Sequence, residues 1–157
     1  MEEYREPTWA LPASWREVVP DAGLMMKRAP EWALPRAKDD RADAMLSAYG
    51  VPENATVEEG WTNSFPDGPL RFSEEAVLGQ AVTIVEGKGS YSRGHATGDA
   101  GKKGYALLGA VVKLNRPFRT MGAYTLCTKF VFEVIGPEKT VLAAREDFLT
   151  LVRGVRP

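Results

Sequence analysis

The chain has 157 residues, a length typical of one domain, and its 44% hydrophobic and 26% charged residues suit a chain with a buried core. Its 20 basic and 21 acidic residues leave a net charge of −1, whereas proteins that hold nucleic acid through their overall field are usually basic. No apolar stretch is long enough to span a bilayer. We therefore expect neither nucleic acid nor a membrane as a partner.

The cysteine and histidine content limits both the compartment and the kind of site. The single cysteine, Cys127, excludes an intramolecular disulfide, and the acidic, polar start of the chain lacks the pattern of a secretory signal. We therefore expect a cytoplasmic protein, or one located within a larger assembled particle. One cysteine and one histidine are too few for a structural zinc site, and we expect no cofactor.

Residues 1–35 are rich in proline and tryptophan, and the prolines recur too closely for a long helix or a central strand. The sequence PTWALP at 7–12 returns as PEWALP at 30–35. We interpret this segment as an extended arm. It presents two tryptophans and two leucines as candidate partner-binding residues: Trp9, Leu11, Trp32 and Leu34. They either pack on the chain's own core or dock on a neighbouring subunit, and the pattern leaves both alternatives open.

Residues 36–157 are expected to form a single α+β domain with a β-rich second half. The main helix is predicted at 36–49, because early aspartates suit the helix dipole and Gly50 with Pro52 ends the pattern. A loop is predicted from 51 to 69, where prolines and glycines recur.

Antiparallel strands are predicted in the second half. The first clear strand is 81–86, and the apolar run at 105–114 fits either a buried strand or a short helix. Residues 124–135 alternate in polarity, and 139–152 are predicted to return as a second long strand, so that the two form a hairpin. The expected fold is an antiparallel sheet, hot-dog-like or a small barrel or sandwich, with one main helix.

The glycine-rich segment 87–104 carries basic side chains and the only histidine. Backbone amides beside cations are able to hold a phosphate or another small anion. The candidate ligand-binding residues are Lys88, Arg93, Lys102, Lys103 and, beyond the segment, Arg116. His95 and Asp99 are the candidate acid–base pair. Neither established phosphate-binding glycine pattern is present, so a simple hairpin or crossover loop remains the alternative.

Three segments carry a resemblance to a known family: LRF at 70–72, LGQ at 78–80 with the strand after it, and EVIGPEKTVLAAREDFLTLVRG at 133–154. Together they resemble hot-dog proteins of the MaoC or FAS1-like dehydratase type. The resemblance implies action on an acyl-thioester. The chain lacks the Asp and His motif of that family, because Gly98-Asp99 is followed by Ala-Gly-Lys, so no catalytic residue is carried over.

Three functions fit these patterns. The first is an interaction or assembly subunit of a homo-oligomer or larger particle, whose arm contacts neighbours. The second is a hot-dog-like enzyme or binder that acts on an acyl-thioester or another small anionic ligand near 87–104. The third is a carrier of an apolar ligand lined by Phe130, Phe132, Val134 and Leu149. Because no catalytic motif occurs, the sequence favours assembly and leaves enzymatic activity undecided.

Overall fold

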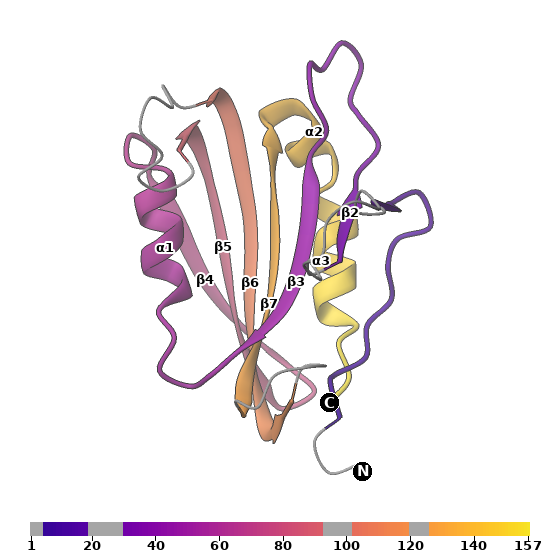
Figure 1. Ribbon diagram of the computed structural model, residues 1–157, viewed down its shortest axis with the longest axis vertical. Helices are drawn as coiled ribbons and strands as arrows, with labels where there is room; N and C mark the ends of the chain where they lie inside the picture. The colour runs from indigo at the N-terminus through magenta and orange to yellow at the C-terminus, as the bar shows by residue number, and fades with distance from the viewer. Residues whose placement is uncertain (1–4, 19–29, 93–101, 120–125) are drawn as a thin grey trace, which may run out of the picture.

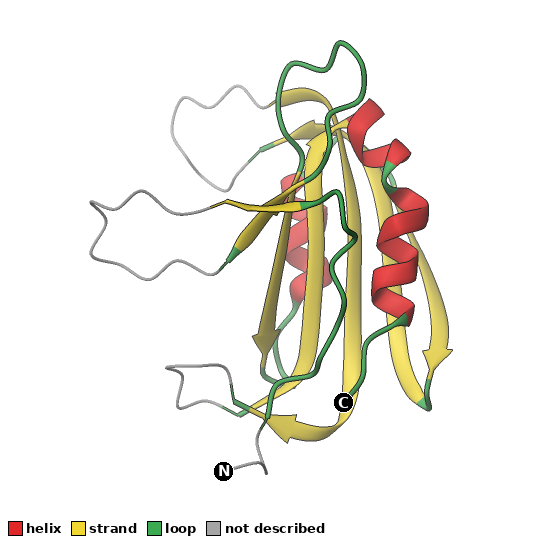
Figure 2. Cartoon of the chain, turned by 90° about the vertical axis from the view of Figure 1, so that its right-hand side faces the viewer, coloured by secondary structure: helices red, strands yellow, loops and turns green. Residues whose placement is uncertain are grey.

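The computed structural model describes residues 5–18, 30–92, 102–119 and 126–157. They form an α+β structure, a seven-stranded antiparallel sheet with three short helices (Figure 1). One helix lies on one face of the sheet, and the other two lie on the opposite face (Figure 2).

The sheet is a meander of four strands with three earlier strands added along one side. The strands are β1 (Arg16–Val18), β2 (Glu31–Ala33), β3 (Met45–Val51), β4 (Leu70–Val77), β5 (Gln80–Tyr91), β6 (Lys102–Phe118) and β7 (Cys127–Pro137). Their order is β1-β2-β3-β7-β6-β5-β4, and every neighbouring pair is antiparallel. Strands β4 to β7 are adjacent in space as in sequence, and the other side of β7 pairs with β3.

The C-terminal segment is helical, so the strand predicted at 139–152 and its hairpin with 124–135 are wrong. The chain forms α2 (Glu138–Ala143) and α3 (Arg145–Arg153) there. The buried side chains of α3 recur at intervals of three and four residues, and they are Phe148, Leu149, Leu151 and Val152. This spacing places them on one side of a helix, whereas a strand would turn half of them to solvent.

The helix predicted at 36–49 is also wrong, and three helices take the place of the single main helix. β3 (Met45–Val51) pairs with β7 over its whole length, from Met45 opposite Ile135 to Val51 opposite Lys129. The alanines and methionine of this segment favour a helix, but the tertiary pairing with β7 overrides that local preference. The loop predicted at 51–69 contains α1 (Val57–Ser64).

Other sequence predictions are confirmed. The strand predicted at 81–86 lies within β5, and the strand predicted at 124–135 corresponds to β7 over its described part. The apolar run at 105–114 belongs to strand β6, which resolves the choice between strand and helix.

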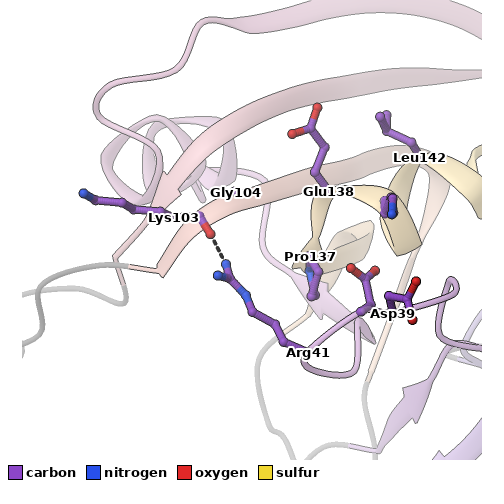
Figure 3. A pocket seen from close by; sticks show the side chains of 9 residues that line it. Asp39, Arg41, Lys103, Gly104, Pro137, Glu138 and Leu142 are labelled. Atoms are coloured by element: carbon purple, nitrogen blue, oxygen red, sulfur yellow. Dashed lines mark hydrogen bonds between the residues drawn. The ribbon is translucent and has the colours of Figure 1, made fainter.

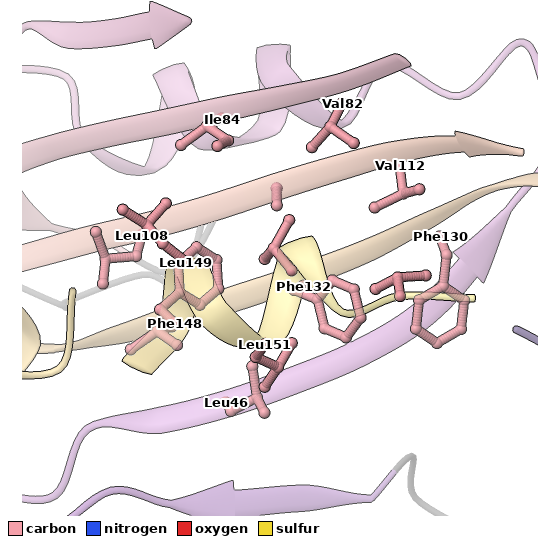
Figure 4. Packing of buried hydrophobic residues seen from close by; sticks show 14 of the residues in the cluster. Leu46, Val82, Ile84, Leu108, Val112, Phe130, Phe132, Phe148, Leu149 and Leu151 are labelled. Carbon is pink, nitrogen blue, oxygen red and sulfur yellow. The ribbon is translucent and has the colours of Figure 1, made fainter. Parts of the chain in front are cut away.

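Two apolar layers cover the two faces of the sheet. On the α3 face, Phe130 and Phe132 of β7 lie against Phe148, Leu149 and Leu151 of α3 (Figure 4). The apolar-carrier interpretation places four side chains around a ligand. In the structure they pack in this layer, and each is 5% exposed or less: Phe130, Phe132, Val134 and Leu149. On the other face, Trp61 of α1 packs on Gly109 of β6, where an added Cβ would lie 2.6 Å from the indole.

The described parts of residues 1–35 join this core. β1 pairs with β2, β2 pairs with β3, and Thr8 exchanges two backbone hydrogen bonds with Arg156, at 2.9 and 2.8 Å. The ring of Trp9 meets Trp32 at a centroid distance of 5.0 Å and Phe132 at 5.3 Å. Leu34 is 2% exposed, and Leu11 packs on the same layer. These side chains thus contact their own chain, and their use by a partner stays a prediction.

Candidate functional site

Helix α1 covers only part of its face of the sheet. Trp61 occupies the surface of β6 at Gly109, and Val131 of β7 is buried with it, while Met45, Ser47, Glu133 and Ile135 on that face stay half-buried. The strand register places Ser47 opposite Glu133 and Met45 opposite Ile135. Opposed residues of antiparallel strands share a face, so the uncovered half of the α1 face presents polar as well as apolar side chains.

A hollow of about 450 Å³ lies over this uncovered half. It is lined by side chains from β2, β3, β5, β6 and β7 and from the segment before β3: Glu31, Asp43, Met45, Ser47, Tyr91, Lys102, Tyr105, Glu133 and Ile135. A concave surface that combines aromatic side chains with a few converging polar groups is typical of a small-molecule site. We call it the α1-face hollow.

Tyr49 and Glu133 form a polar pair on the same strands. The Tyr49 hydroxyl donates a hydrogen bond to Oε2 of Glu133 at 3.4 Å. Burial, together with the charge and the hydrogen bond of Glu133, raises the pKa of Tyr49 far above its usual value. The phenol therefore stays protonated at neutral pH and acts as a donor, and Glu133 supplies a hydrogen-bond acceptor at the site.

Tyr105 forms one wall of the hollow and gathers two cations. Its ring stacks on that of Tyr91 with an interplanar angle of 4° and a centroid distance of 6.0 Å. The guanidinium of Arg41 lies 5.6 Å from the Tyr105 centroid, and the ammonium of Lys102 lies 5.7 Å from it. Cations in such positions are attracted by the negative face of the ring, which fixes positive charge at the rim of the site.

A second hollow of about 540 Å³ lies beside the start of α2, between Arg41, Lys103 and Glu138 (Figure 3). Arg41 and Lys103 line it and also line a third hollow, of about 500 Å³, which contains Lys102 and Tyr105. The guanidinium of Arg41 donates a hydrogen bond to the backbone carbonyl of Lys103. The third hollow thus shares Lys102 and Tyr105 with the first and Arg41 and Lys103 with the second, and we call the three together the concave surface.

Three of the acidic side chains on this surface have a partner among the described residues, whereas Glu31 and Asp39, which also line it, form no ion pair with a described residue. Asp43 forms an ion pair with Arg36 at 2.7 Å, and Glu138 pairs with Lys88 at 3.4 Å. Asp40 accepts hydrogen bonds from the backbone N–H and the hydroxyl of Thr140.

The cations on this surface, unlike these acidic side chains, have no partner of opposite charge among the described residues. Within the part of the chain that the structure describes, no carboxylate lies at ion-pair distance from Arg41, Lys102 or Lys103. Arg41 and Lys102 instead face the ring of Tyr105, and Arg41 also donates to the backbone carbonyl of Lys103.

The structure brings some of the predicted ligand-binding residues together and separates others. Lys102 and Lys103 lie on the concave surface, and Lys88 reaches its margin through Glu138. Arg116 lies near the other end of β6, whose Phe118 pairs with Cys127. The remaining candidates lie outside the described residues: Arg93, His95 and Asp99.

Sequence reasoning missed most of the side chains that form the surface: Arg41, Tyr49, Tyr91, Tyr105 and Glu133. Tyr105 directly follows Lys102-Lys103-Gly104 and begins an apolar run, so the sequence alone could have indicated an aromatic side chain beside cations. The pairing of Tyr49 with Glu133 depends on β3 being a strand, which the local sequence does not indicate.

Comparison of the sequence with known proteins does not indicate a function. No protein-family model matches this chain, and no curated protein matches it. Among the described helices, none combines the length and the apolar character needed to cross a membrane. Residues 5–18, 30–92, 102–119 and 126–157 contain no group of three or more His, Cys, Asp or Glu side chains arranged to hold a metal ion.

Proposed function

We propose that the protein binds a small organic anion on the concave surface around Tyr105. The observation that carries this proposal is the pair of cations, Arg41 and Lys102, held over one aromatic ring without a carboxylate partner among the described residues. A carboxylate or phosphate group bound by either cation would gain a charge-assisted hydrogen bond, which is about twice as strong as a neutral one.

The rest of the surface suits the remainder of such a molecule. The ring of Tyr91, which is half-buried and stacks on Tyr105, offers an aromatic surface against which a planar or aliphatic group would pack. Ser47, at the floor, offers a hydroxyl as donor and acceptor, and Glu133 offers an acceptor. The ligand class is therefore an amphiphilic anion, with its charge at the rim and its polar substituents toward the floor.

Acyl-thioesters of a phosphorylated carrier belong to this class, and the resemblance to hot-dog proteins supports including them. Within the hollow, Glu133 accepts a hydrogen bond from the protonated hydroxyl of Tyr49. We propose binding as the function and assign no catalytic step.

The test is a calorimetric titration with three probes: benzoate, inorganic phosphate and acetyl-coenzyme A. We expect at least one probe to bind, and we expect Arg41→Gln and Lys102→Gln each to weaken binding about tenfold, the loss of one charge-assisted hydrogen bond. Lys113→Gln is the matched control. It removes the same charge from β6, but Lys113 pairs with Glu53 at 3.1 Å and lies outside the three hollows.

Two results would contradict the proposal. One is the absence of binding by all three probes. The other is an equal loss in Lys113→Gln, which would show that binding follows overall charge rather than the surface around Tyr105.

Assembly into a homo-oligomer or a larger particle is the second candidate function. The observation that favours it is a group of large apolar side chains that remain exposed: Val18, Phe72, Leu78, Leu126 and Leu142. Two of them, Phe72 and Leu78, belong to the same hairpin of β4 and β5. Exposed apolar side chains of this size become buried when a second copy covers them, which is the reason to test assembly. Light scattering on the full chain tests this candidate, because a monomer at all concentrations would exclude self-assembly.

A further inference from the structure

Strand β4 (Leu70–Val77) is an unprotected edge of the sheet. Among the described strands it pairs only with β5, and all of its eight residues pair without a shift in register. It contains no proline, lysine or bulge, which are devices that natural proteins use to block an edge. The opposite edge, β1, has only three residues.

The side chains of β4 are also open to solvent. Five of them are exposed: Arg71, Phe72, Ser73, Glu74 and Ala76. Phe72 is 52% exposed and lies on the α1 face, since it pairs with Val85, a member of the layer under α1. Neither α1 nor any other described element therefore covers this part of the edge.

The hairpin after β4 determines which backbone groups are free. Val77 and Gln80 flank a two-residue turn in which Leu78 and Gly79 have positive φ angles of 51° and 77°, as in a type I′ turn. Residues that flank such a turn exchange backbone hydrogen bonds, and bonded and non-bonded pairs then alternate along the ladder. The odd-numbered residues of β4 thus bond to β5, and the N–H and C=O groups of its even-numbered residues point outward: Leu70, Phe72, Glu74 and Ala76.

We propose that two copies of the chain pair through β4, antiparallel and about a two-fold axis that passes beside Ser73, so that two sheets join into one. This pairing would satisfy the outward backbone groups of both copies at once. A two-fold axis is the commonest symmetry of soluble oligomers, and it makes a single strand complementary to itself.

The side chains favour this register over its neighbours. With Ser73 at the axis, Arg71 lies opposite Glu75 of the partner subunit, twice in the dimer, and Phe72 lies opposite Glu74 of the partner subunit. The two Phe72 rings are then diagonal neighbours, within reach of each other. An axis at Glu74 would bring two like charges face to face, and an axis at Phe72 would place Arg71 opposite a serine.

The contacts of Glu75 leave room for this second cation. Arg153 of α3 already donates to both carboxylate oxygens of Glu75, at 2.7 and 3.0 Å. A carboxylate has about four acceptor positions, so Arg71 from a second copy is able to bind without displacing Arg153.

The experiment is sedimentation equilibrium on the full chain and two matched variants. We expect the full chain to be a dimer. Glu74→Pro removes an outward N–H but no hydrogen bond to β5, and proline is tolerated on an edge strand in that position. We therefore expect Glu74→Pro to be a monomer with an unchanged circular dichroism spectrum, and Glu74→Ala, which keeps the N–H, to remain a dimer.

A second variant keeps the proposal testable if Glu74→Pro does not fold. Arg71→Glu places like charges opposite each other in both halves of the interface, and we expect it to raise the dimer dissociation constant at least about tenfold. A monomeric full chain would overturn the proposal. A strand from another protein would then be the remaining candidate to pair with β4. A dimer with the same dissociation constant in Glu74→Pro and Arg71→Glu would overturn it as well, because the interface would then lie elsewhere.

Discussion

Gln80 is a polar side chain within the apolar layer between the sheet and α3. It alternates along β5 with Val82 and Ile84, which both belong to that layer, and it is 1% exposed. Neither its amide nitrogen nor its amide oxygen has a hydrogen-bond partner in the described structure. Burial of an amide without a partner costs about 1–3 kcal/mol, so this residue lowers the stability of the fold.

We predict that Gln80→Met stabilises the protein. Methionine has a similar length and flexibility, and it removes the desolvation cost of the amide, so the free energy of unfolding should rise by about 1–2 kcal/mol. Urea denaturation followed by circular dichroism measures the change, and Gln80→Glu, which buries a charge, should act in the opposite direction. A destabilised Gln80→Met protein would show that the amide has a partner in solution.

Single residues also show how far the sequence leads toward the site. Lys102 and Lys103 could be selected because they are cations in a glycine-rich segment, and both lie on the concave surface. Arg41 could not be selected, because its position over Tyr105 depends on the path of the segment between β2 and β3. Charge and composition identify candidate ligand-binding residues, but only the tertiary structure shows which cations lie over the same aromatic ring.

At the scale of elements, α2 depends on a residue far away in the sequence. Its own N-cap residue, Pro137, provides no side-chain cap. Asp40, from the segment before β3, accepts a hydrogen bond from the backbone N–H of Thr140 at 3.0 Å and another from the Thr140 hydroxyl. The hydroxyl oxygen of Thr140 in turn accepts a hydrogen bond from the N–H of Ala37, at 2.9 Å. Asp40 therefore caps α2 and fastens the 36–44 segment, which carries Arg41 to the site.

We predict that Asp40→Ala lowers the free energy of unfolding by about 1–2 kcal/mol, the usual effect of losing a capping side chain with its hydrogen bonds. Asp39→Asn is the matched control. It removes the same charge from the adjacent residue, and asparagine tolerates the positive φ of 67° at that position. Chemical denaturation of both variants measures the difference, and equal losses would show that charge, rather than capping, is responsible.

The elements that the sequence predicts correctly are those in which local pattern and tertiary environment agree. The strands at 81–86 and 124–135 alternate or are rich in β-branched residues, and both are central in the sheet. The 138–153 segment contains helix-forming Ala, Leu, Glu and Arg with apolar residues at helical spacing, so the sequence contains the signal for its helices. The strand prediction was wrong because it ignored the spacing of three and four residues between the apolar positions. The local sequence does not predict β3, because the pairing of this segment with β7 determines its conformation.

At the scale of the whole molecule, the two ends of the described chain lie together on the α3 side. Thr8 bonds to Arg156, and Trp9 packs by its edges on Trp32 and Phe132, so the repeated Trp motifs help to close the apolar layer under α3. This arrangement gives the tryptophans a structural role within one chain. The assembly proposal gives them a role between chains, and the two roles predict different effects of one substitution.

We predict that Trp9→Ala lowers the free energy of unfolding by about 2 kcal/mol and leaves the mass in solution unchanged. The loss is smaller than the 3–5 kcal/mol typical of a fully buried aromatic side chain, because Trp9 is only partly buried. Trp9→Phe retains an aromatic edge against Phe132 and should lose less. Denaturation and light scattering on the same samples separate the two roles. A fall in mass with unchanged stability would contradict this prediction, because it would place the main contacts of Trp9 on a neighbouring subunit, as the arm interpretation requires.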